Sequence, residues 1–577
     1  MTASDDRDQQ GAPGPETSRP SRTLQVVAMA LVLVSGLAGI LAARWLRPGQ
    51  SRAEPKAPPA VAELGVKIPN HLFRGWDKPD MVLVLTGSQH GYLLPCGCSR
   101  PQKGGLERRH NFVQALRERG WTVAAVDVGD IAQMHGPRGL ANEQGLLKYV
   151  YSMRALKKIG YSAVSFGAYE AALPLDSALA EYALQDPVPR VLAANLKDRE
   201  KNFPEMLGEW LEIKDLPIKT GVTACIGATV EEKIKDANVK FEWSAHALGR
   251  ILPKMNKAGI QLRVLLYQGY ATSHLQGTNA GKPEGIRCAE AFPQFQIMLA
   301  LGEEDEPSGR PLMVNNDNTL IASLGHKGRH VGVVGIWRSQ HDRKPFKLEY
   351  QLVDMDEDFL TPKDKEEGHP IVQMMEEYTT ELKRRDMQAK FGQTKHPMQV
   401  MDPVADLHKD TPSIPKYVGS EKCKSCHADA YDIWKQTAHS HAYQTLEGAK
   451  RPALRQFDAE CIVCHATGFG YHTGFTNATA TPKLKDVGCE SCHGPGSHHA
   501  MNHKDKVWQE RMNPWKAPAN ENAGDKAKRL SRLDIFCQTC HDHDNDVTWT
   551  AEKGRSGFDK KWPKIAHPTE IPPAESK

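Results

Sequence analysis

Four copies of one short motif give this 577-residue chain its clearest chemistry. In each copy two cysteines are separated by two residues and followed at once by a histidine, CxxCH. The copies are Cys423, Cys426 and His427; Cys461, Cys464 and His465; Cys489, Cys492 and His493; and Cys537, Cys540 and His541. This motif attaches c-type haem: the thiols form thioethers to the porphyrin, and the adjacent imidazole becomes the proximal iron ligand. The sequence therefore predicts four covalently bound haems c.

Two other uses of paired cysteines fit these motifs less well. Zinc ribbons also pair CxxC units, but they do not need a histidine directly after each pair. A dithiol oxidoreductase needs one such pair at the start of a helix, and this chain repeats the motif four times. Haem attachment explains every feature of the repeats.

The sixth ligand of each iron must come from elsewhere in the C-terminal region, residues 414–577. The histidines there that are not proximal are His439, His441, His472, His498, His499, His503, His543 and His567. Only Met501 and Met512 offer sulfur, so bis-histidine ligation should dominate and give lower potentials than His/Met ligation. Any single histidine of this set can equally be a surface residue. His541 and His543 are too close in sequence to flank one porphyrin.

Three segments of this region, residues 417–442, 460–470 and 486–503, resemble the tetrahaem cytochrome c family of nitrifying bacteria. That family accepts electrons from hydroxylamine oxidation, and the resemblance covers about residues 415–570. It implies that His439 crosses over to the haem of the third motif. It also implies that a late histidine, His567, serves the fourth haem.

The same resemblance suggests ligands for the first two haems. His503 lies where the family places the distal ligand of the first haem, and His498 and His499 are close rivals. The second motif has no matching distal histidine, which implies a five-coordinate iron open to NO or another small ligand. His472 is close enough in sequence to His465 to be an alternative sixth ligand.

The elements that must position these motifs divide the chain into regions of different composition. We expect the following order: 1–23 a disordered leader; 24–44 a transmembrane anchor; 45–79 a Pro- and Ala-rich linker; 80–355 an α/β domain; 356–413 a helix and linker; and 414–577 a tetrahaem, mostly α-helical and irregular, cytochrome domain. Such a length is too great for one compact core.

In the region of residues 80–355 and the helix that follows it, short apolar, β-branched runs alternate with amphipathic stretches. Strands are expected at 81–87, 122–129, 162–167, 190–195, 222–228, 263–269, 319–325, 331–337 and 346–353, and helices at 106–120, 143–160 and 371–388. This alternation predicts an α/β domain with a largely buried sheet.

This region resembles the calcineurin-like metallophosphoesterases of the 5′-nucleotidase type. The resemblance is carried by LTGSQHGYLLPCGC (85–98), GGLERR (104–109), VDVGD (126–130), GYSAVSFGAYE (160–170) and SLGHKGRHVG (323–332). It implies a two-layered β-sandwich flanked by helices. In the family this fold holds two divalent metals bridged by a carboxylate.

Most metal ligands that the family would supply are replaced here. Of the expected set, His90 and Asp130 survive, and the positions of the other ligands read Ser88, Ala168, Tyr169 and Gln268. A substitute carboxylate is available among Glu303, Glu304 and Asp305, while His326 and His330 match a turn that holds no ligand in the family. Two metals that share an attacking hydroxide need more ligands than this. We therefore expect no divalent metal in the α/β domain and no phosphoesterase chemistry.

The N-terminal segment suggests the compartment. Residues 24–43 carry no charge over a length that can cross a bilayer, and arginines flank them on both sides. A cleaved signal peptide is the alternative. In either case the bulk of the chain is expected on the periplasmic, exported side. There the remaining cysteines, Cys96, Cys98, Cys225 and Cys288, predict disulfides, although Cys96 and Cys98 are too close to bridge each other.

These expectations combine into one function. The chain should be a membrane-anchored multihaem cytochrome for periplasmic electron transfer, with an unidentified redox partner protein and a degenerate phosphoesterase-like domain. A net charge of +4 gives no indication of nucleic-acid binding. The alternatives are a bifunctional phosphoesterase with a haem domain, a reductase of NO or a nitrogen oxide at a five-coordinate haem, and a subunit that only conducts electrons within a larger complex.

Overall fold

The computed structural model describes residues 65–95, 101–133, 135–140, 143–173, 188–197, 206–234, 239–272, 281–302, 304–341, 344–400, 414–542, 545–546, 548–549 and 557–567. All of them belong to one compact unit, Leu64–Lys577. The expected leader (1–23), the expected anchor (24–44), the linker up to residue 64, and Cys96, Cys98 and Glu303 lie outside these ranges. Within the ranges, no helix combines the length and apolar character that a membrane span requires.

The first part of the unit contains a seven-stranded sheet in the order β13-β12-β1-β2-β3-β4-β5. Its strands are β1 (Met81–Thr86), β2 (Val123–Asp127), β3 (Tyr161–Ser165), β4 (Arg190–Leu192), β5 (Leu207–Gly208), β12 (His330–His341) and β13 (Lys344–Asp354). Strands β1 to β5 are parallel, and β12 and β13 are antiparallel additions. All six residues of β1 are buried, as expected for a central parallel strand with both faces covered.

A six-stranded sheet in the order β10-β11-β9-β8-β7-β6 forms the second layer. Its strands are β6 (Trp210–Ile213), β7 (Thr220–Ile226), β8 (Leu262–Tyr270), β9 (Ile297–Leu301), β10 (Leu312–Val314) and β11 (Thr319–Ala322). Side chains from both sheets, such as Val84 and Val222, share one apolar core. The two-layered arrangement expected from the sequence is therefore present.

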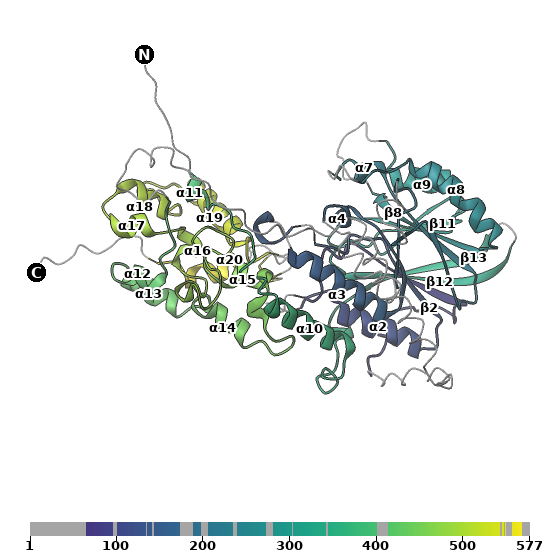
Figure 1. Ribbon diagram of the computed structural model, residues 1–577, viewed down its shortest axis with the longest axis horizontal. Helices are drawn as coiled ribbons and strands as arrows, with labels where there is room; N and C mark the ends of the chain where they lie inside the picture. Colours follow the sequence, from purple (N-terminus) through teal and green to yellow (C-terminus); the bar gives the residue numbers. More distant parts are fainter. Residues whose placement is uncertain are drawn as a thin grey trace, which may run out of the picture. The chain divides into compact units, whose positions relative to one another are not determined.

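Helices cover the outer faces of the sheets (Figure 1). The helices α2 (Leu106–Glu118), α3 (Glu143–Ile159) and α10 (Pro370–Arg384) pack together beside the first sheet. The helices α8 (Ser244–Lys257) and α9 (Glu284–Ala291) pack on the second sheet around a smaller core. Short helices α4 (Ala168–Ala171) and α7 (Ala228–Glu231) follow strands β3 and β7.

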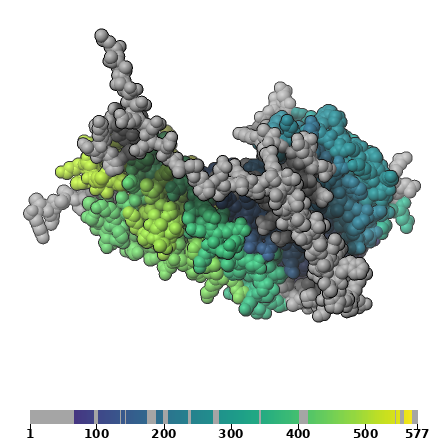
Figure 2. Space-filling view, viewed as in Figure 1, coloured from purple at the N-terminus to yellow at the C-terminus, as the bar shows by residue number. Residues whose placement is uncertain are grey.

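The C-terminal region consists of short helices joined by turns. They are α11 (Pro397–Val400), α12 (Ser420–Lys424), α13 (Ala428–Lys435), α14 (Ala442–Glu447), α15 (Ala459–His465), α16 (Cys489–His493), α17 (Ser497–Met501), α18 (Lys506–Met512), α19 (Ala523–Cys537) and α20 (Gly557–Lys561). In the space-filling view, these green to yellow residues gather in one body (Figure 2). The described apolar clusters here contain nine and three buried residues, so side chains alone give this region a smaller core than that of the α/β part.

The predicted strands and helices of the α/β part are confirmed in place and type. The helix expected at 371–388 is α10, which ends at Arg384. The sequence missed β5, β6, β9 and β10, which are short or carry few β-branched residues. The expected disulfides are not formed by Cys225 of β7 and Cys288 of α9, which are both free thiols.

Candidate functional sites

Each CxxCH motif lies on a single helical turn. The second and third motifs lie entirely within α15 and α16. In the first and fourth motifs, the backbone N–H of the histidine donates to the carbonyl of the first cysteine, as His427 does to Cys423 at 2.9 Å and His541 to Cys537 at 2.9 Å. Residues three and four apart share one face of a helix, so each motif presents two thiols and one imidazole to the same side.

The four motifs come together as two pairs. The thiols of Cys423 and Cys489 are hydrogen-bonded, which joins the first motif to the third and lowers the pKa of Cys489 to about 7. The thiols of Cys464 and Cys540 join the second motif to the fourth in the same way, and this hydrogen bond lowers the pKa of Cys540 to about 7. Residues 66 and 76 positions apart in the chain are thus brought into contact.

Three of the four proximal histidines face a second imidazole at nearly the same distance. The ring centroids of His427 and His499 are 6.1 Å apart, those of His541 and His439 are 6.0 Å apart, and those of His493 and His567 are 5.9 Å apart. A metal–imidazole bond is about 2 Å long, so two imidazoles on opposite sides of one metal have ring centroids about 6 Å apart. The spacing fits bis-histidine ligation.

The proximal histidines of the last three motifs are oriented through their Nδ1 atoms. Nδ1 lies 2.7 Å from the carbonyl oxygen of Ala442 in His465 and 2.5 Å from that of Met512 in His493. In His541 it lies 2.9 Å from a carboxylate oxygen of Asp546. These contacts leave Nε2 as the ligating atom and fix the ring plane, as outer-shell partners of metal-bound histidines do.

His465 differs from the other proximal histidines. Among the described residues, no histidine ring lies opposite it at the distance seen in the other three motifs. His472, the alternative ligand, is half-buried, and its backbone is held by Thr394 and Gln399. The geometry therefore offers the second iron one imidazole.

The three histidines that are candidate sixth ligands of the first haem have different surroundings. His498 is buried and stacks on Trp508 with 4.7 Å between ring centroids. His503 is exposed, whereas His499 is the residue that faces His427. All three lie in or just after α17. In an α-helix, successive side chains point in directions about 100° apart around the axis. Sequence spacing alone could not resolve which of them points inward.

The two crossing ligands also differ from the expectation drawn from the resemblance. His439 was expected beside the third motif and lies with His541 of the fourth, while His567 was expected beside the fourth and lies with His493 of the third. His439 is held by its carbonyl, which accepts the N–H of Val487 at 3.0 Å. A histidine remote in sequence can reach either haem of a domain, and only the tertiary packing decides which one.

The residues present fit four c-type haems. Each motif has two thiols and an imidazole on one face, and three motifs have a second imidazole at the distance that one bound iron requires. His439, which burial leaves with a pKa of about 4, is a neutral ligand at neutral pH. The carboxylate of Asp546 contacts both His541 and Lys561, and no motif in the sequence indicated this role.

The second candidate site is the remnant site of the α/β part, defined by His90, Asp130, Tyr169, Glu170 and Gln268. The structure brings the two predicted survivors together, since the N–H of His90 donates to the carbonyl of Asp130 at 2.8 Å. Tyr169 bridges them: its ring stacks on His90 at 4.3 Å, and its N–H donates to Asp130 at 2.9 Å. Burial lowers the pKa of His90 to about 3 and raises that of Asp130 to about 6.

Hydrogen bonds occupy the other groups of the remnant site. The carboxylate of Glu170 accepts N–H bonds from Gly167, Asp130, Ile131 and Ala132 at 2.7 to 3.0 Å. The amide of Gln268 donates to the carbonyl of Val128 at 2.5 Å. The carboxylate of Glu170 therefore holds the loops, whereas Oε1 of Gln268 is buried and accepts no hydrogen bond from the described residues.

The candidate substitutes for lost ligands also have other partners. Asp305 accepts from His326 at 2.6 Å and from Arg329 at 2.7 Å, on an exposed loop. Glu304 accepts from the hydroxyl of Thr272 at 2.9 Å. Glu303 lies outside the described residues.

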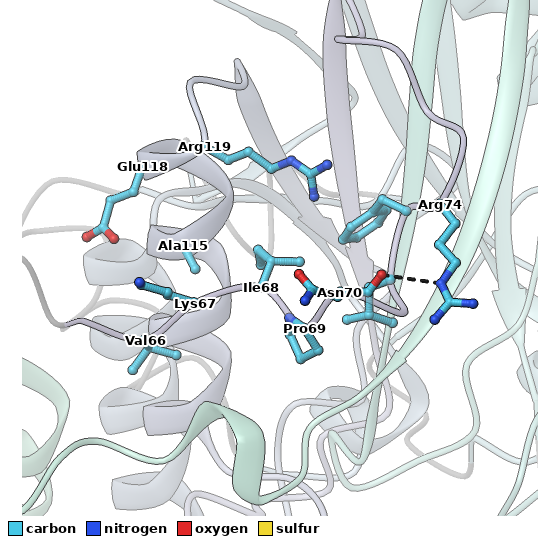
Figure 3. Close-up of a pocket in the computed structure, with 11 residues that line it drawn as sticks. Val66, Lys67, Ile68, Pro69, Asn70, Arg74, Ala115, Glu118 and Arg119 are labelled. Carbon is cyan, nitrogen blue, oxygen red and sulfur yellow. Dashed lines mark hydrogen bonds between the residues drawn. The ribbon is translucent and has the colours of Figure 1, made fainter.

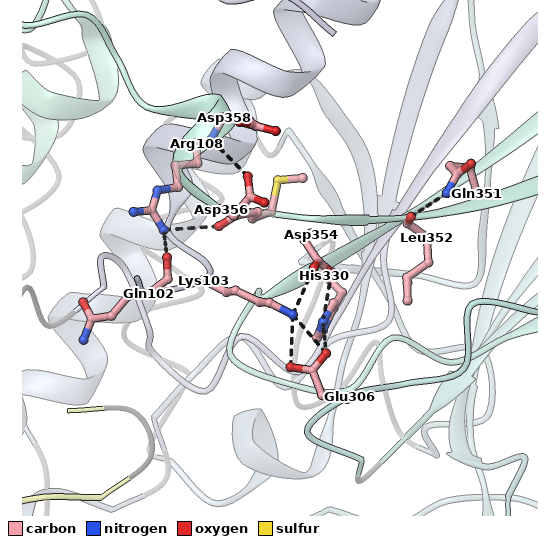
Figure 4. Close-up of polar contacts among 11 residues, drawn as sticks. Gln102, Lys103, Arg108, Glu306, His330, Gln351, Leu352, Asp354, Asp356 and Asp358 are labelled. Atoms are coloured by element: carbon pink, nitrogen blue, oxygen red, sulfur yellow. Dashed lines mark hydrogen bonds and ion pairs between the residues drawn. The ribbon is translucent and has the colours of Figure 1, made fainter. Parts of the chain in front are cut away.

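One cluster of metal-binding residue types is found in the described ranges, away from the remnant site. Glu306, His330 and Asp354 place ligand atoms within 4.8 Å of one another. The ammonium of Lys103 points between the two carboxylates, 2.9 Å from Glu306 and 3.0 Å from Asp354 (Figure 4). A cation already balances these charges, so the arrangement is an ion-pair network.

A surface cavity of about 490 Å³ lies between residues 66–74 and helix α2. Figure 3 shows Ile68 and Pro69 on one side and Ala115 and Arg119 on the other. None of its lining residues belongs to a haem motif or to the remnant site. We assign it no role in the chemistry.

Comparison with known proteins supports the reading of the C-terminal region. The family described as cytochrome c554 and c-prime matches residues 422–494, which contain the first three motifs. Cytochrome c-554 of Nitrosomonas europaea is 31% identical over 148 residues, which are 24% of this chain and 62% of that protein. The resemblance inferred from the motifs is confirmed, and the chain spans less than two thirds of this relative.

Solved structures similar to the chain include phosphoesterases. A 5′-nucleotidase precursor from Thermus thermophilus has 17% identity and a TM-score of 0.41, covering 53% of this chain and 59% of its own. A calcineurin-like phosphoesterase from Bacillus subtilis has 13% identity and a TM-score of 0.40, covering 52% of this chain and 97% of its own.

Proposed function

We propose that this chain is an electron-transfer protein that holds four covalently attached c-type haems, next to a phosphoesterase-like domain that no longer hydrolyses phosphate esters. The observation that carries the proposal is the pairing of the motifs, with imidazoles about 6 Å apart at three of them. A bound haem c supplies a one-electron redox centre. The chain's own residues decide its ligands, its surroundings and its neighbours.

We assign the axial ligands from the ring geometry. His427 and His499 would hold the first haem, His493 and His567 the third, and His541 and His439 the fourth. Six-coordinate bis-histidine centres have lower potentials than His/Met centres. The carboxylate of Asp546 on His541 makes that imidazole more basic and should lower the fourth potential further.

The second haem would have His465 as its one protein ligand. The contact of its Nδ1 with the carbonyl of Ala442 would orient the ring so that Nε2 could hold the haem, which could then also bind a small ligand. Binding of NO or a related molecule at this site is the second candidate function. It is favoured by the absence of a facing imidazole among the described histidines.

The contact between paired motifs favours rapid electron exchange. Thiols of the first and third motifs touch, as do those of the second and fourth, so the attached groups must be neighbours. The chain thereby keeps four redox centres in two close pairs. A redox partner protein, which the sequence does not identify, would exchange electrons with one of them.

The geometry of the remnant site supports the proposal that the α/β part no longer hydrolyses phosphate esters. A dinuclear centre needs several free ligand atoms and an open position for hydroxide. Here the carboxylate of Glu170 is engaged by backbone N–H groups, and the side-chain amide of Gln268 donates to the carbonyl of Val128. We propose that this domain serves as a scaffold for the haem domain.

The proposal includes the location of the chain in the cell. Covalent haem attachment and the apolar segment at residues 24–44 together favour a chain whose bulk is exported and which is held at the membrane by that segment. Nothing in its charge favours nucleic acid as a partner.

The first experiment is metal analysis of the purified chain combined with a phosphodiesterase assay. We expect four irons per chain, negligible manganese, zinc, cobalt or nickel, and no turnover of a chromogenic phosphodiester with added manganese. Four irons with one or two other metals and turnover would show a working hydrolase. Zinc in place of iron would overturn the haem assignment.

A further inference from the structure

Arg138 of the α/β part has a backbone that a side chain rarely adopts. It lies in the short 3-10 helix η1 (Pro137–Gly139) between β2 and α3, with φ 60° and ψ 22°. This left-handed conformation is unfavourable for a residue with a Cβ. Such a residue persists where its surroundings hold it, and the strain points to a role for the side chain.

The side chain of Arg138 reaches the segment that follows the second haem motif. Its Nε donates to the carbonyl of Phe469 at 2.5 Å, and its guanidinium lies 3.9 Å from the ring centroid of Tyr471. At Gly470, with φ 78°, a Cβ would lie 3.1 Å from Cδ of Arg138, which is closer than ordinary van der Waals contact. These residues come four to six positions after His465.

The α/β part also holds the start of α15, which carries the second motif. The side-chain amide of Gln144 donates to Asp458 at 2.7 Å and accepts from the N–H of Ala459 at 3.2 Å. Lys148 forms an ion pair with Glu460, the residue before Cys461. Contacts of the α/β part with residues before and after the second motif therefore fix the position of Arg138 relative to that motif.

The guanidinium of Arg138 lies over the ring of Tyr471, six residues after His465, so its charge lies beside the second motif. Among the described residues, no carboxylate forms an ion pair with Arg138, although its neighbours on α3, Lys148 and Arg154, both have one. An arginine fork matches a carboxylate geometrically, and each haem carries two propionate carboxylates.

We propose that Arg138 is a positioning residue for the haem of the second motif: it binds a carboxylate of that haem and raises its potential. This inference rests on the proposed function. A positive charge beside a haem favours the reduced form, which carries one more electron. The phosphoesterase-like domain would thus set a redox property of the domain it supports.

The test compares three variants by spectroelectrochemical titration of the full chain. Arg138→Asn removes the charge and tolerates a left-handed backbone. We expect the redox equilibrium of at least one haem to shift tenfold or more toward the oxidised form, which is about 59 mV for one electron. Arg138→Lys should retain most of the wild-type value. Arg154→Gln is the matched control, because it removes one exposed positive charge of α3 and should shift no haem.

Two results would overturn the inference. One is a set of four potentials in Arg138→Asn that equals the set in Arg154→Gln. The other is an equal shift in Arg138→Lys and Arg138→Asn, which would indicate packing instead of charge. If Arg138→Asn loses haem, Arg138→Gly gives the same comparison, because glycine adopts this backbone freely. A wild-type chain with fewer than four haems would contradict the proposed function itself.

Discussion

His499 and His503 lie four residues apart, but only His499 faces a proximal histidine. Its ring centroid is 6.1 Å from that of His427, and His503 is exposed near the start of α18. The two residues have the same chemistry and nearly the same place in the sequence. They therefore make a matched pair of sites for testing the axial assignment.

We predict that His499→Ala removes the sixth ligand of the first haem. That haem should change from low spin to high spin, which adds one high-spin centre to the electron paramagnetic resonance spectrum of the oxidised chain. His503→Ala is the control and should leave the spectrum unchanged. The reverse result, with the new signal in His503→Ala, would restore the ligand expected from the resemblance.

At the scale of residues, the attachment sites can be assigned from the sequence, whereas the partners of the crossing ligands cannot. Cys423 to His541 could be assigned because thioether bonds and a proximal imidazole require a fixed local spacing. The partner of His439 could not, because a distal ligand only has to reach the iron from any direction. His90 and Asp130 were expected to be neighbours, and the structure brings them together.

Helix α15 is the element that connects the two regions. The ion pair of Lys148 with Glu460 lies at its start, and the side chain of Lys148 is only 4% exposed while that of Glu460 is 36% exposed. Removing one partner of a largely buried pair leaves the other charge poorly solvated. The exposed side of Glu460 reduces that cost.

We predict that Lys148→Met destabilises the docking of α15 by about 1–3 kcal/mol. Urea unfolding followed by the Soret absorbance should show this as an earlier transition. The double variant with Glu460→Gln should recover part of the loss, because no unpaired charge remains. Additive losses in the two single variants and the double variant would show that the pair contributes nothing.

Helix α10 begins at a histidine that must stay neutral. Nδ1 of His369 accepts the N–H of Val372 at 3.3 Å, and its Nε2 lies 2.8 Å from Oδ1 of Asn111. The ring also packs edge-on against His110, with 4.8 Å between centroids. Burial lowers the pKa of His369 to about 3 and that of His110 to about 4, from an ordinary value of 6.5.

We predict that acid destabilises the packing of α10 on α2. The unfolded chain takes up protons on both histidines below pH 6.5, whereas the folded chain does so only near pH 4 and 3. Their stabilising contribution is complete above pH 6.5 and falls by up to about 1.4 kcal/mol per pH unit for each histidine as the pH drops toward 4.

Urea unfolding at pH 7 and pH 5 measures this loss. His369→Asn keeps an N-cap side chain and removes one of the two titrating groups. Its loss of stability between the two pH values should be smaller than that of the wild type by up to half. An unchanged loss would mean that His369 is not the group responsible.

At the scale of the whole molecule, the sequence predicted both regions and the two layers of the first one. The strands β1, β2, β3 and β8 were readable because they are long runs of apolar, β-branched residues. The haem region has no comparable pattern of apolar residues. Its described apolar clusters are small, and its fold is arranged around the four motifs. The contact between the regions, through Arg138 and Lys148, could not be read from either part alone.

The four haems should not be equivalent toward small ligands. Three proximal histidines face a second imidazole, and His465 faces none among the described residues, so one iron in four should be open. We predict that the fully reduced chain binds one carbon monoxide per four haems, measured by titration of the Soret band. His465→Gly should abolish or strongly alter that binding, while His541→Gly should add a second binding haem. Binding of no carbon monoxide by the wild type would show that a sixth ligand, such as His472, closes the second iron.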